Sequence, residues 1–184
     1  RHAQTIHDAA GRMAGMINNL LVYFRLDSGK ETPVIKPFKL RSIAEILETE
    51  FAPLAKNKGL GFNIDVETDD IVSGDRNRIL SIGSNLLSNA IKFTKSGTVT
   101  LSTSYKNNVF TLIVSDTGTG MTEEQQPRVF APFERLGNAV TEDGFGLGLA
   151  IVSDTVKLLN GSITVESEPG KGSRFTVSLP LPKA

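Results

Sequence analysis

Residues 85–94 read Asn-Leu-Leu-Ser-Asn-Ala-Ile-Lys-Phe-Thr, and the interpretation of the whole chain depends on them. In a helix that turns by about 100° per residue, Asn85, Asn89 and Lys92 fall within a sector of about 60°. An apolar stripe borders this sector, formed by Ile79, Ile82, Leu86, Ala90 and Phe93. Amide oxygens can ligate hard cations, and a lysine can face phosphate oxygens. The stretch is therefore either a core helix with solvated polar residues or a helix that binds a cation and a phosphate.

The composition excludes several classes of function. With 184 residues, 39% apolar and 22% charged, the chain is long enough for one globular domain and an appendage. The net charge of zero gives no electrostatic support for binding nucleic acid, so none is expected as a partner. The absence of cysteine excludes disulfides, thiolate metal sites and cysteine nucleophiles. The only histidines, His2 and His7, lie together at the start, which argues against a histidine metal site.

The apolar runs and the N-terminal residues of the sequence indicate where the protein is located. No run of 18 apolar residues and no signal peptide is present, so a cytoplasmic location is expected for this segment. Whether the parent protein is anchored in the inner membrane stays open. The chain begins abruptly in a helical pattern, which is typical of a piece of a longer protein.

Residues 3–28 are predicted to form one long amphipathic helix. Its apolar stripe has heptad spacing and consists of Ile6, Ala9, Ala10, Met13, Met16, Ile17, Leu20, Tyr23 and Phe24. Each buried leucine or methionine contributes about 1.5–3 kcal/mol, so this face is expected to pack against partner helices in a bundle or dimer. Gly29 ends the helix, and Pro33 and Pro37 mark an extended linker.

The rest of the chain alternates helical and strand patterns. The predicted strands cover 38–40, 60–66, 71–73, 98–105, 109–116, 162–166 and 174–179. The helices after the first cover 42–58, 75–94 and 145–159, and a further short helix is expected between the Asp116 glycine segment and the loop that starts at Glu134. Ser42 and Asp75 are expected to cap two helices, and Asn107-Asn108 to form a hairpin turn. The predicted fold is an α/β (α+β) two-layer sandwich, with a mixed, mostly antiparallel sheet covered by helices on one face.

Three glycine-rich segments could bind a ligand. Asp116-Thr117-Gly118-Thr119-Gly120 places a carboxylate at a strand end, where it could accept a hydrogen bond from an amine such as that of adenine, or simply cap a turn. Gly144-Phe145-Gly146-Leu147-Gly148-Leu149 enters a helix, whose free N–H groups could hold phosphates. It matches neither the dinucleotide-binding nor the P-loop motif. Gly170-Lys171-Gly172-Ser173 is equally well explained as a tight hairpin.

Together and in this order, these segments resemble the ATP-binding domain of sensor histidine kinases. Residues 85–92, Asp116-x-Gly-x-Gly, Phe130-x-x-Phe133-x-Arg135, Gly144-x-Gly-Leu-Gly-Leu and Gly170-x-Gly-Ser look like the family's N, G1, F, G2 and G3 boxes. The resemblance covers about residues 31–180 and implies the sandwich fold that gyrase-type and mismatch-repair ATPases share. Residues 1–30 look like the second helix of the family's dimerisation and phosphoacceptor hairpin.

The resemblance implies ATP and Mg²⁺ as cofactors and assigns a role to each motif. Asn89 would ligate Mg²⁺, Asn85 and Lys92 would contact the cation and phosphates, and Asp116 would bind the adenine amine. The other implied nucleotide contacts are Gly118, Gly120 and Ser173 around adenine, and Gly144, Gly146, Leu147 and Gly148 around the phosphates. A serine at position 173 replaces the commoner threonine and keeps the hydroxyl.

A loop over the nucleotide is implied as well. Residues 134–143 would form a mobile lid, with Phe130 and Phe133 packed at its base as core residues rather than nucleotide contacts. Arg135 either reaches the γ-phosphate as a catalytic residue or is a solvated surface charge.

The chain departs from the family in one respect, because neither His2 nor His7 lies in a phosphoacceptor motif. His7-Asp8 is followed by Ala-Ala-Gly-Arg, without the proline or the arginine spacing of that motif. Both are expected to be surface histidines, and the acceptor histidine to lie outside this chain. The resemblance implies a homodimer through the helical bundle and a response-regulator receiver domain as a partner. A hydrolytic ATPase and a nucleotide-binding regulatory module without kinase activity remain as alternatives.

Overall fold

The structure is a computed structural model that describes residues 2–134 and 146–184, with the side chains of 2–9, 12 and 27 left out. The helices are α1 (His2–Asp27), α2 (Arg41–Asn57), α3 (Arg76–Phe93), the short 3-10 helix η1 (Arg128–Phe130) and α4 (Gly148–Leu158). The strands are β1 (Lys36–Lys39), β2 (Gly61–Val66), β3 (Ile71–Gly74), β4 (Thr98–Lys106), β5 (Val109–Asp116), β6 (Ser162–Glu168) and β7 (Gly172–Pro180). The elements agree with the prediction in type and order.

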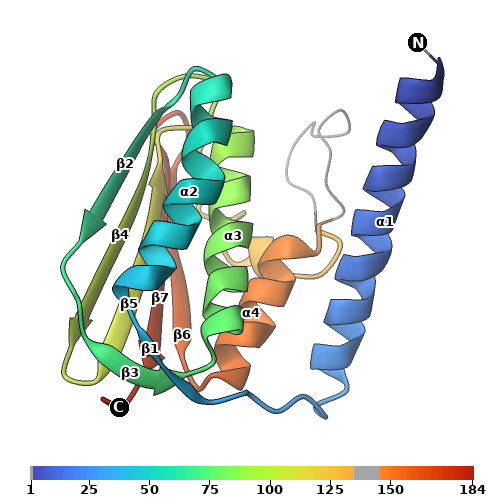
Figure 1. Cartoon of the computed structure of the whole chain (residues 1–184). Helices are drawn as coiled ribbons and strands as arrows, with labels where there is room; N and C mark the ends of the chain where they lie inside the picture. Colours follow the sequence, from blue (N-terminus) through green and yellow to red (C-terminus); the bar gives the residue numbers. More distant parts are fainter. Residues whose placement is uncertain (1, 135–145) are drawn as a thin grey trace.

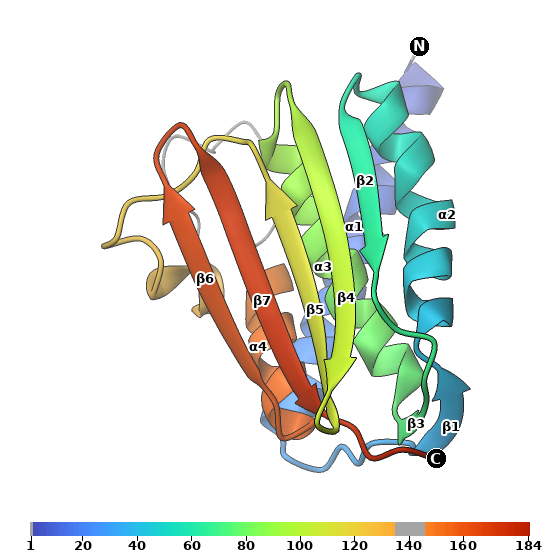
Figure 2. The ribbon, with the colours of Figure 1, turned by 90° about the vertical axis from the view of Figure 1, so that its left-hand side faces the viewer.

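The main sheet has five strands in the order β2-β4-β5-β7-β6, and β1 and β3 pair as a separate two-stranded sheet. Only β2 and β4 run parallel, while the other neighbours in the sheet are antiparallel. Figure 2 shows the sheet face-on, with α2, α3 and α4 behind it. The predicted sandwich, with a mixed and mostly antiparallel sheet covered on one face, is confirmed.

The core lies between the sheet and these three helices (Figure 1). Its largest fully buried side chains are Phe110, Leu40, Ile43, Leu47, Ile79, Ile82, Leu86, Leu87, Leu101, Leu112, Leu147 and Leu179. In β5 the buried residues alternate with half-exposed ones until the strand reaches Asp116. The alternation arises because successive side chains of a strand point to opposite faces, so the row of buried residues leads directly to that carboxylate.

The predicted capping residues have different outcomes. Asp75 does cap α3, because its side chain accepts a hydrogen bond from the backbone N–H of Arg78 at 3.1 Å. Ser42 does not cap α2, which begins at Arg41 after Leu40 with no side-chain cap. The Ser42 hydroxyl instead donates to the carbonyl of Lys39 at 2.7 Å, so the prediction for this residue was wrong.

Two turns rely on asparagines in the left-handed region, and the first of them is the predicted hairpin. Asn107 and Asn108 have φ values of 53° and 59°, which join β4 and β5 in a two-residue hairpin. Asn160 has a φ of 56° and ends α4, where Gly161 N–H donates to Val156 O at 2.9 Å. The helix itself begins at Gly148 and not near residue 145, so Gly146 and Leu147 lie before its first turn.

Helix α1 lies beside α4 and leaves much of its apolar face exposed (Figure 1). Its exposed apolar side chains are Met13, Met16, Ile17, Leu21 and Phe24, whereas Leu20 and Tyr23 are half-buried. Contact with α4 therefore satisfies only part of the heptad stripe. The expectation that further helices pack against α1 remains a prediction.

Candidate functional site

Helix α3 presents Asn85, Asn89 and Lys92 along one edge, as its spacing predicted. All three residues are half-buried. The Asn85 amide nitrogen donates to the carbonyl of Ser81 at 2.8 Å, which fixes the side chain along the helix. The Lys92 ammonium lies 4.7 Å from the centre of the Phe93 ring. The edge of α3 thus carries two amides and a cation that is also held by an aromatic face.

Gly148, the first residue of α4, lies directly against the two asparagines. A Cβ atom at this position would be 3.1 Å from Asn85 Oδ1 and 4.0 Å from Asn89 Nδ2. The first N–H groups of a helix have no partner within it and favour anions. The second glycine segment and helix α3 therefore meet at one place, where the free N–H groups at the start of α4 lie beside the amides of Asn85 and Asn89. Leu147, which precedes this glycine, is only 1% exposed and is therefore a core residue of the turn.

Asp116 is at the end of β5, and the loop that follows it contacts Phe93, the last residue of α3. Its Oδ1 accepts a hydrogen bond from Gly118 N–H at 2.8 Å. Burial raises the pKa of this carboxyl above its usual value of 3.8, and the backbone N–H groups of Gly118 and Ser173 oppose that rise. Gly118 has no room for a side chain, because a Cβ would be 2.5 Å from the carbonyl oxygen of Phe93. A partly desolvated carboxylate is thus fixed against the end of α3.

The Gly170-x-Gly-Ser hairpin closes over the same carboxylate. Ser173 is opposite Asp116 in the β5–β7 pair. A Cβ on Gly172, whose φ is +96°, would be 1.9 Å from the carbonyl oxygen of Asp116. A Cβ on Gly120, whose φ is +63°, would be 1.9 Å from Glu168 O. The two glycine segments are therefore packed backbone to backbone, which only glycine permits.

Ser167 joins these two segments and had no sequence signal. Its Oγ accepts from Met121 N–H at 2.8 Å, donates to Gly172 O at 2.8 Å, and lies 2.9 Å from Ser173 Oγ. Its hydroxyl thus contacts both the segment after Asp116 and the hairpin. An alternating serine in a strand gives no indication of such a role from sequence alone.

The two phenylalanines of the Phe130-x-x-Phe133-x-Arg135 motif lie in different environments in the structure. Phe130 is half-buried and lies edge-on to Phe175, with ring centres 6.3 Å apart, so its expected place in the core is confirmed. Phe133 is 57% exposed and its ring lies 6.4 Å from that of Tyr23 in α1. The expectation of a packed core position for Phe133 was therefore wrong. It bridges the sandwich and the N-terminal helix instead.

Part of the predicted site lies outside the described residues. The predictions for Arg135 and Gly144 fall on residues that are not described, and Glu134 is the only described residue of the predicted lid over 134–143. Gly146 is described, with a φ of +69° and its carbonyl accepting from Phe133 N–H at 2.9 Å. A Cβ on it would be 2.6 Å from Glu134 O, so this glycine also permits a close backbone approach.

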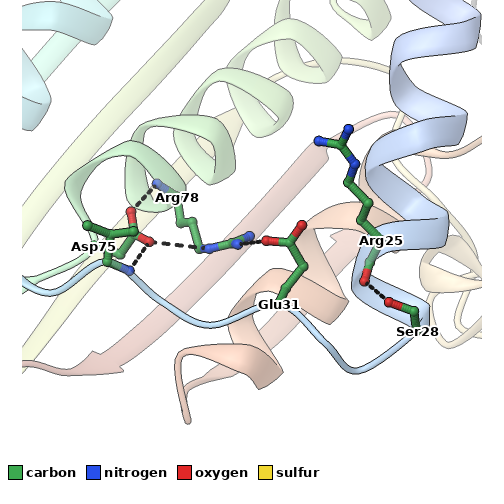
Figure 3. A network of polar contacts seen from close by, with 6 residues as sticks. Arg25, Ser28, Glu31, Asp75 and Arg78 are labelled. Atoms are coloured by element: carbon green, nitrogen blue, oxygen red, sulfur yellow. Dashed lines mark hydrogen bonds and ion pairs between the residues drawn. The ribbon is translucent and has the colours of Figure 1, made fainter.

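A polar network fixes the other end of α3 (Figure 3). Asp75, 5% exposed, accepts from Val34 N–H at 2.8 Å and lies 3.3 Å from Arg78 Nε. Arg78 also forms an ion pair with Glu31 in the linker after α1. Because these groups are largely buried, they stabilise one position of the linker against α3. The Asp75 cap was predicted from the sequence, whereas the link to residues more than 40 positions earlier was not.

Any Mg²⁺ site here would use few protein ligands. No group of three or more His, Cys, Asp or Glu residues within 2–134 and 146–184 could hold a metal ion. Mg²⁺ commonly binds through one or two protein oxygens together with phosphate oxygens and waters. The half-buried Asn89 beside the start of α4 fits that pattern.

Within the described residues, no helix has the length and apolar content needed to cross a membrane.

Comparison with known proteins gives a consistent result. Residues 74–183 match the family described as histidine kinase-, DNA gyrase B- and HSP90-like ATPase. The chain is 34% identical over 185 residues to the sensor histidine kinase RcsC of Escherichia coli K12, covering 98% of this chain and 20% of that protein. It is 35% identical over 188 residues to the sensor histidine kinase GacS of Pseudomonas protegens, covering 97% and 20%. The chain thus spans about a fifth of the length of these relatives.

Solved structures agree with the sequence matches. The full-length ShkA crystal structure in complex with AMPPNP superimposes with a TM-score of 0.90 and 26% identity, covering 100% of this chain and 39% of that one. The catalytic domain of the histidine kinase ThkA superimposes with a TM-score of 0.70 and 24% identity, covering 80% of this chain and 95% of that one.

Proposed function

This chain belongs to the histidine kinase-, DNA gyrase B- and HSP90-like ATPase family, as the catalytic domain of a sensor histidine kinase, and we propose that it binds Mg-ATP and presents the γ-phosphate to a histidine of a dimerisation domain. The observation that carries the proposal is the meeting of three segments at α3. Gly148 lies against Asn85 and Asn89, and Gly118 lies against the last carbonyl of the same helix. One helix thus joins the N-terminus of α4, where phosphates could bind, to a half-buried carboxylate.

The two ends of the nucleotide site have separate roles in the proposal, and both lie along the C-terminal half of α3. Asp116 accepts the adenine amine, with Gly118, Gly120 and Ser173 shaping its pocket. At the phosphate end, Asn89 would hold Mg²⁺, Asn85 and Lys92 contact the cation and phosphates, and Gly146, Leu147 and Gly148 bring the start of α4 to the phosphate oxygens. Gly144 and Arg135 are proposed to complete this end. Mg²⁺, when bound, neutralises charge on the phosphates.

Asn85 favours phosphoryl transfer to a side chain over hydrolysis by water. The carboxamide has no basic site that could take a proton from water, whereas a carboxylate there could act as a general base. This chain's residues therefore bind, orient and screen the triphosphate, and the nucleophile comes from elsewhere. In the proposal, residues 1–30 are half of a dimerisation and phosphoacceptor domain, and 31–184 are the ATP-binding domain with a lid over 134–143.

The partners of the parent protein follow from the same proposal. The exposed apolar face of α1 packs into a homodimeric helical bundle. The phosphohistidine then serves a response-regulator receiver domain. In this proposal ATP is the substrate and Mg²⁺ is its cofactor. Both bind through local groups of the site, so the net charge of zero does not oppose their binding.

Phosphotransfer to an added acceptor is the test of this function. The chain is incubated with γ-labelled ATP alone and after fusion to a helical segment that carries a histidine in the family's phosphoacceptor motif. We expect acid-labile label only in the fusion, and only on the added histidine. Label on His2 or His7 would contradict the proposal. Rapid release of inorganic phosphate without labelled protein would favour a hydrolytic ATPase, and ATP binding without either reaction would favour a regulatory module.

The Mg²⁺ role of Asn89 is testable by binding alone. In the unaltered chain, we expect ATP to bind more tightly in Mg²⁺ than in EDTA. Asn89→Ala should lower the affinity for Mg-ATP about tenfold, as expected for one lost polar contact of about 1.4 kcal/mol, and should abolish the difference between Mg²⁺ and EDTA. Titration calorimetry measures both. The control is Asn77→Ala, an exposed position of the same helix. A Mg²⁺ dependence that survives in Asn89→Ala would contradict this assignment.

A further inference from the structure

The C-terminus of α3 is unusual in that partners outside the helix bind its last carbonyls. The last four carbonyl groups of a helix have no partner within it. In α3 they belong to Ala90, Ile91, Lys92 and Phe93. Ala90 O accepts from Thr94, through the backbone N–H at 3.1 Å and the hydroxyl at 2.7 Å.

Lys58, from a different helix, binds two of these carbonyls. Its ammonium donates to Ile91 O at 2.6 Å and to Lys92 O at 2.8 Å. An ammonium group has three donors, so it can bind two acceptors at once, and a cation is favoured at the negative end of a helix. Lys58 places a full positive charge at the end of the helix that carries Asn85 and Asn89.

The backbone around Lys58 fixes where its side chain starts. Lys58 is the C-terminal cap of α2, and its backbone N–H bonds to Leu54 O and Ala55 O. Gly59 follows with a φ of +74°, and Leu60 N–H returns to Ala55 O at 2.9 Å. This cap leaves little freedom for the position of the Lys58 Cα. The backbone of one residue closes α2 while its side chain closes α3.

The remaining α3 carbonyl connects this end of the helix to the Asp116 loop. Phe93 O accepts from Thr119 N–H at 3.4 Å. The same oxygen would lie 2.5 Å from a Cβ on Gly118, whose N–H binds Asp116 Oδ1. A displacement of the last turn of α3 would therefore move the loop that holds the carboxylate. It would also move Lys92, which is in the same turn.

We infer that Lys58 is a positioning residue of the nucleotide site, which holds the last turn of α3 so that Lys92 and the Asp116 loop keep their places. The inference rests on the proposed function, since it assigns Lys58 to the ATP site described above. In this inference Lys58 has no direct contact with the nucleotide. It acts through the carbonyls of Ile91 and Lys92, and through Phe93 to Thr119.

The test compares Lys58→Met, Lys58→Arg and Lys56→Met in the 184-residue chain. Methionine is similar to lysine in length but has no donor, whereas arginine keeps charge and donors. Lys56 is an exposed lysine in the last turn of the same helix and is the matched control. ATP and ADP affinities are measured by calorimetry well below the melting temperature. The amide resonance of Thr119 is followed by NMR, because a purely stabilising lysine would not affect it.

We expect Lys58→Met to lower the affinity for ATP and for ADP about tenfold, the effect of one lost charged hydrogen bond, and to shift the Thr119 resonance. Lys58→Arg should recover most of the affinity, and Lys56→Met should match the unaltered chain. Should Lys58→Met fail to fold, Lys58→Gln keeps a neutral donor and should lower affinity by a smaller factor.

A folded Lys58→Met or Lys58→Gln variant with unchanged ATP affinity would overturn the inference and leave the proposed function intact. A loss of affinity that Lys58→Arg does not restore at all would also overturn it. Failure of the unaltered chain to bind ATP would overturn the proposed function, and the inference with it.

Discussion

Asp116→Asn is expected to weaken ATP binding by about 1–3 kcal/mol, which is roughly 5- to 150-fold, without loss of the fold. The change removes the negative charge that would accept the adenine amine. The amide oxygen of asparagine can still accept from Gly118 N–H, which Asp116 Oδ1 binds at 2.8 Å. The loop should therefore keep its shape, and the loss should be confined to ligand binding. Calorimetry on both proteins measures it.

The raised pKa of Asp116 leads to a second expectation, for stability, in which Asp116→Asn has an effect opposite in sign to its effect on ATP binding. Burial raises this pKa above 3.8, so the folded chain binds the proton more tightly than the unfolded chain does. The stability contribution of this group is therefore greatest at low pH and is lost as pH rises from about 3.8 through the raised pKa. Asp116→Asn removes that loss. At neutral pH the variant should be at least as stable as the unaltered chain while binding ATP more weakly.

The same titration should appear in binding. Only the ionised carboxylate is a charged acceptor, so the affinity advantage over Asp116→Asn should shrink as pH falls through the raised pKa. Asp65→Asn, at an exposed position of β2, is the control and should show neither effect. Equal ATP affinity of Asp116→Asn and the unaltered chain at neutral pH would contradict the placement of adenine at this residue.

The features that sequence predicted were those determined by local chemistry. Asn107 and Asn108 tolerate positive φ and so mark their own hairpin, and Asp75 precedes its helix with a carboxylate that can reach the next N–H groups. Alternation along β5 predicted that Asp116 would end a buried row. In each case the residue and its partner are close in sequence, so spacing alone carries the information.

Local rules failed where a competing partner lay nearby. Ser42 has the chemistry of a helix cap, but its hydroxyl binds Lys39 O and the helix has already begun at Arg41. Phe133 is apolar and adjoins the core, but its φ of +63° accompanies a largely exposed ring. Propensity does not reveal which of two available partners a side chain will choose.

Contacts between distant residues could not be predicted at all. Lys58 binds Ile91 O across 33 positions, and Met121 N–H donates to Ser167 Oγ across 46 positions. A lysine at the end of an amphipathic helix is indistinguishable from a solvated one until the neighbouring helix end is in place. The glycine segments were predicted in part: their pattern indicated ligand-binding segments or tight turns, but only the structure shows that Gly172 faces the Asp116 carbonyl.

Gly172→Ala is expected to reduce stability by about 2–4 kcal/mol and ATP affinity by at least as much as Asp116→Asn does. An L-residue at a φ of +96° is strained, and a Cβ would be 1.9 Å from Asp116 O, 2.7 Å from its carbonyl carbon and 2.8 Å from Thr117 Cα. Left-handed strain of about 1 kcal/mol and overpacking of about 1–3 kcal/mol give the expected range. Backbone atoms cannot rotate away, so β5 and β7 must separate at the Asp116–Ser173 pair.

Gly170→Ala separates the clash at Gly172 from the strain. Gly170 has a φ of +77°, similar to that of Gly172, but a Cβ there would meet no atom within 4 Å. Its alanine variant should lose only the strain of about 1 kcal/mol and should bind ATP normally. Chemical denaturation and calorimetry on the two variants distinguish the outcomes. If both lost the same stability and neither lost affinity, the close approach of Gly172 to Asp116 would have no part in forming the adenine pocket. We expect Gly172→Ala to lose more stability than Gly170→Ala and to lose ATP affinity as well, because only Gly172 makes the close backbone contact between β5 and β7.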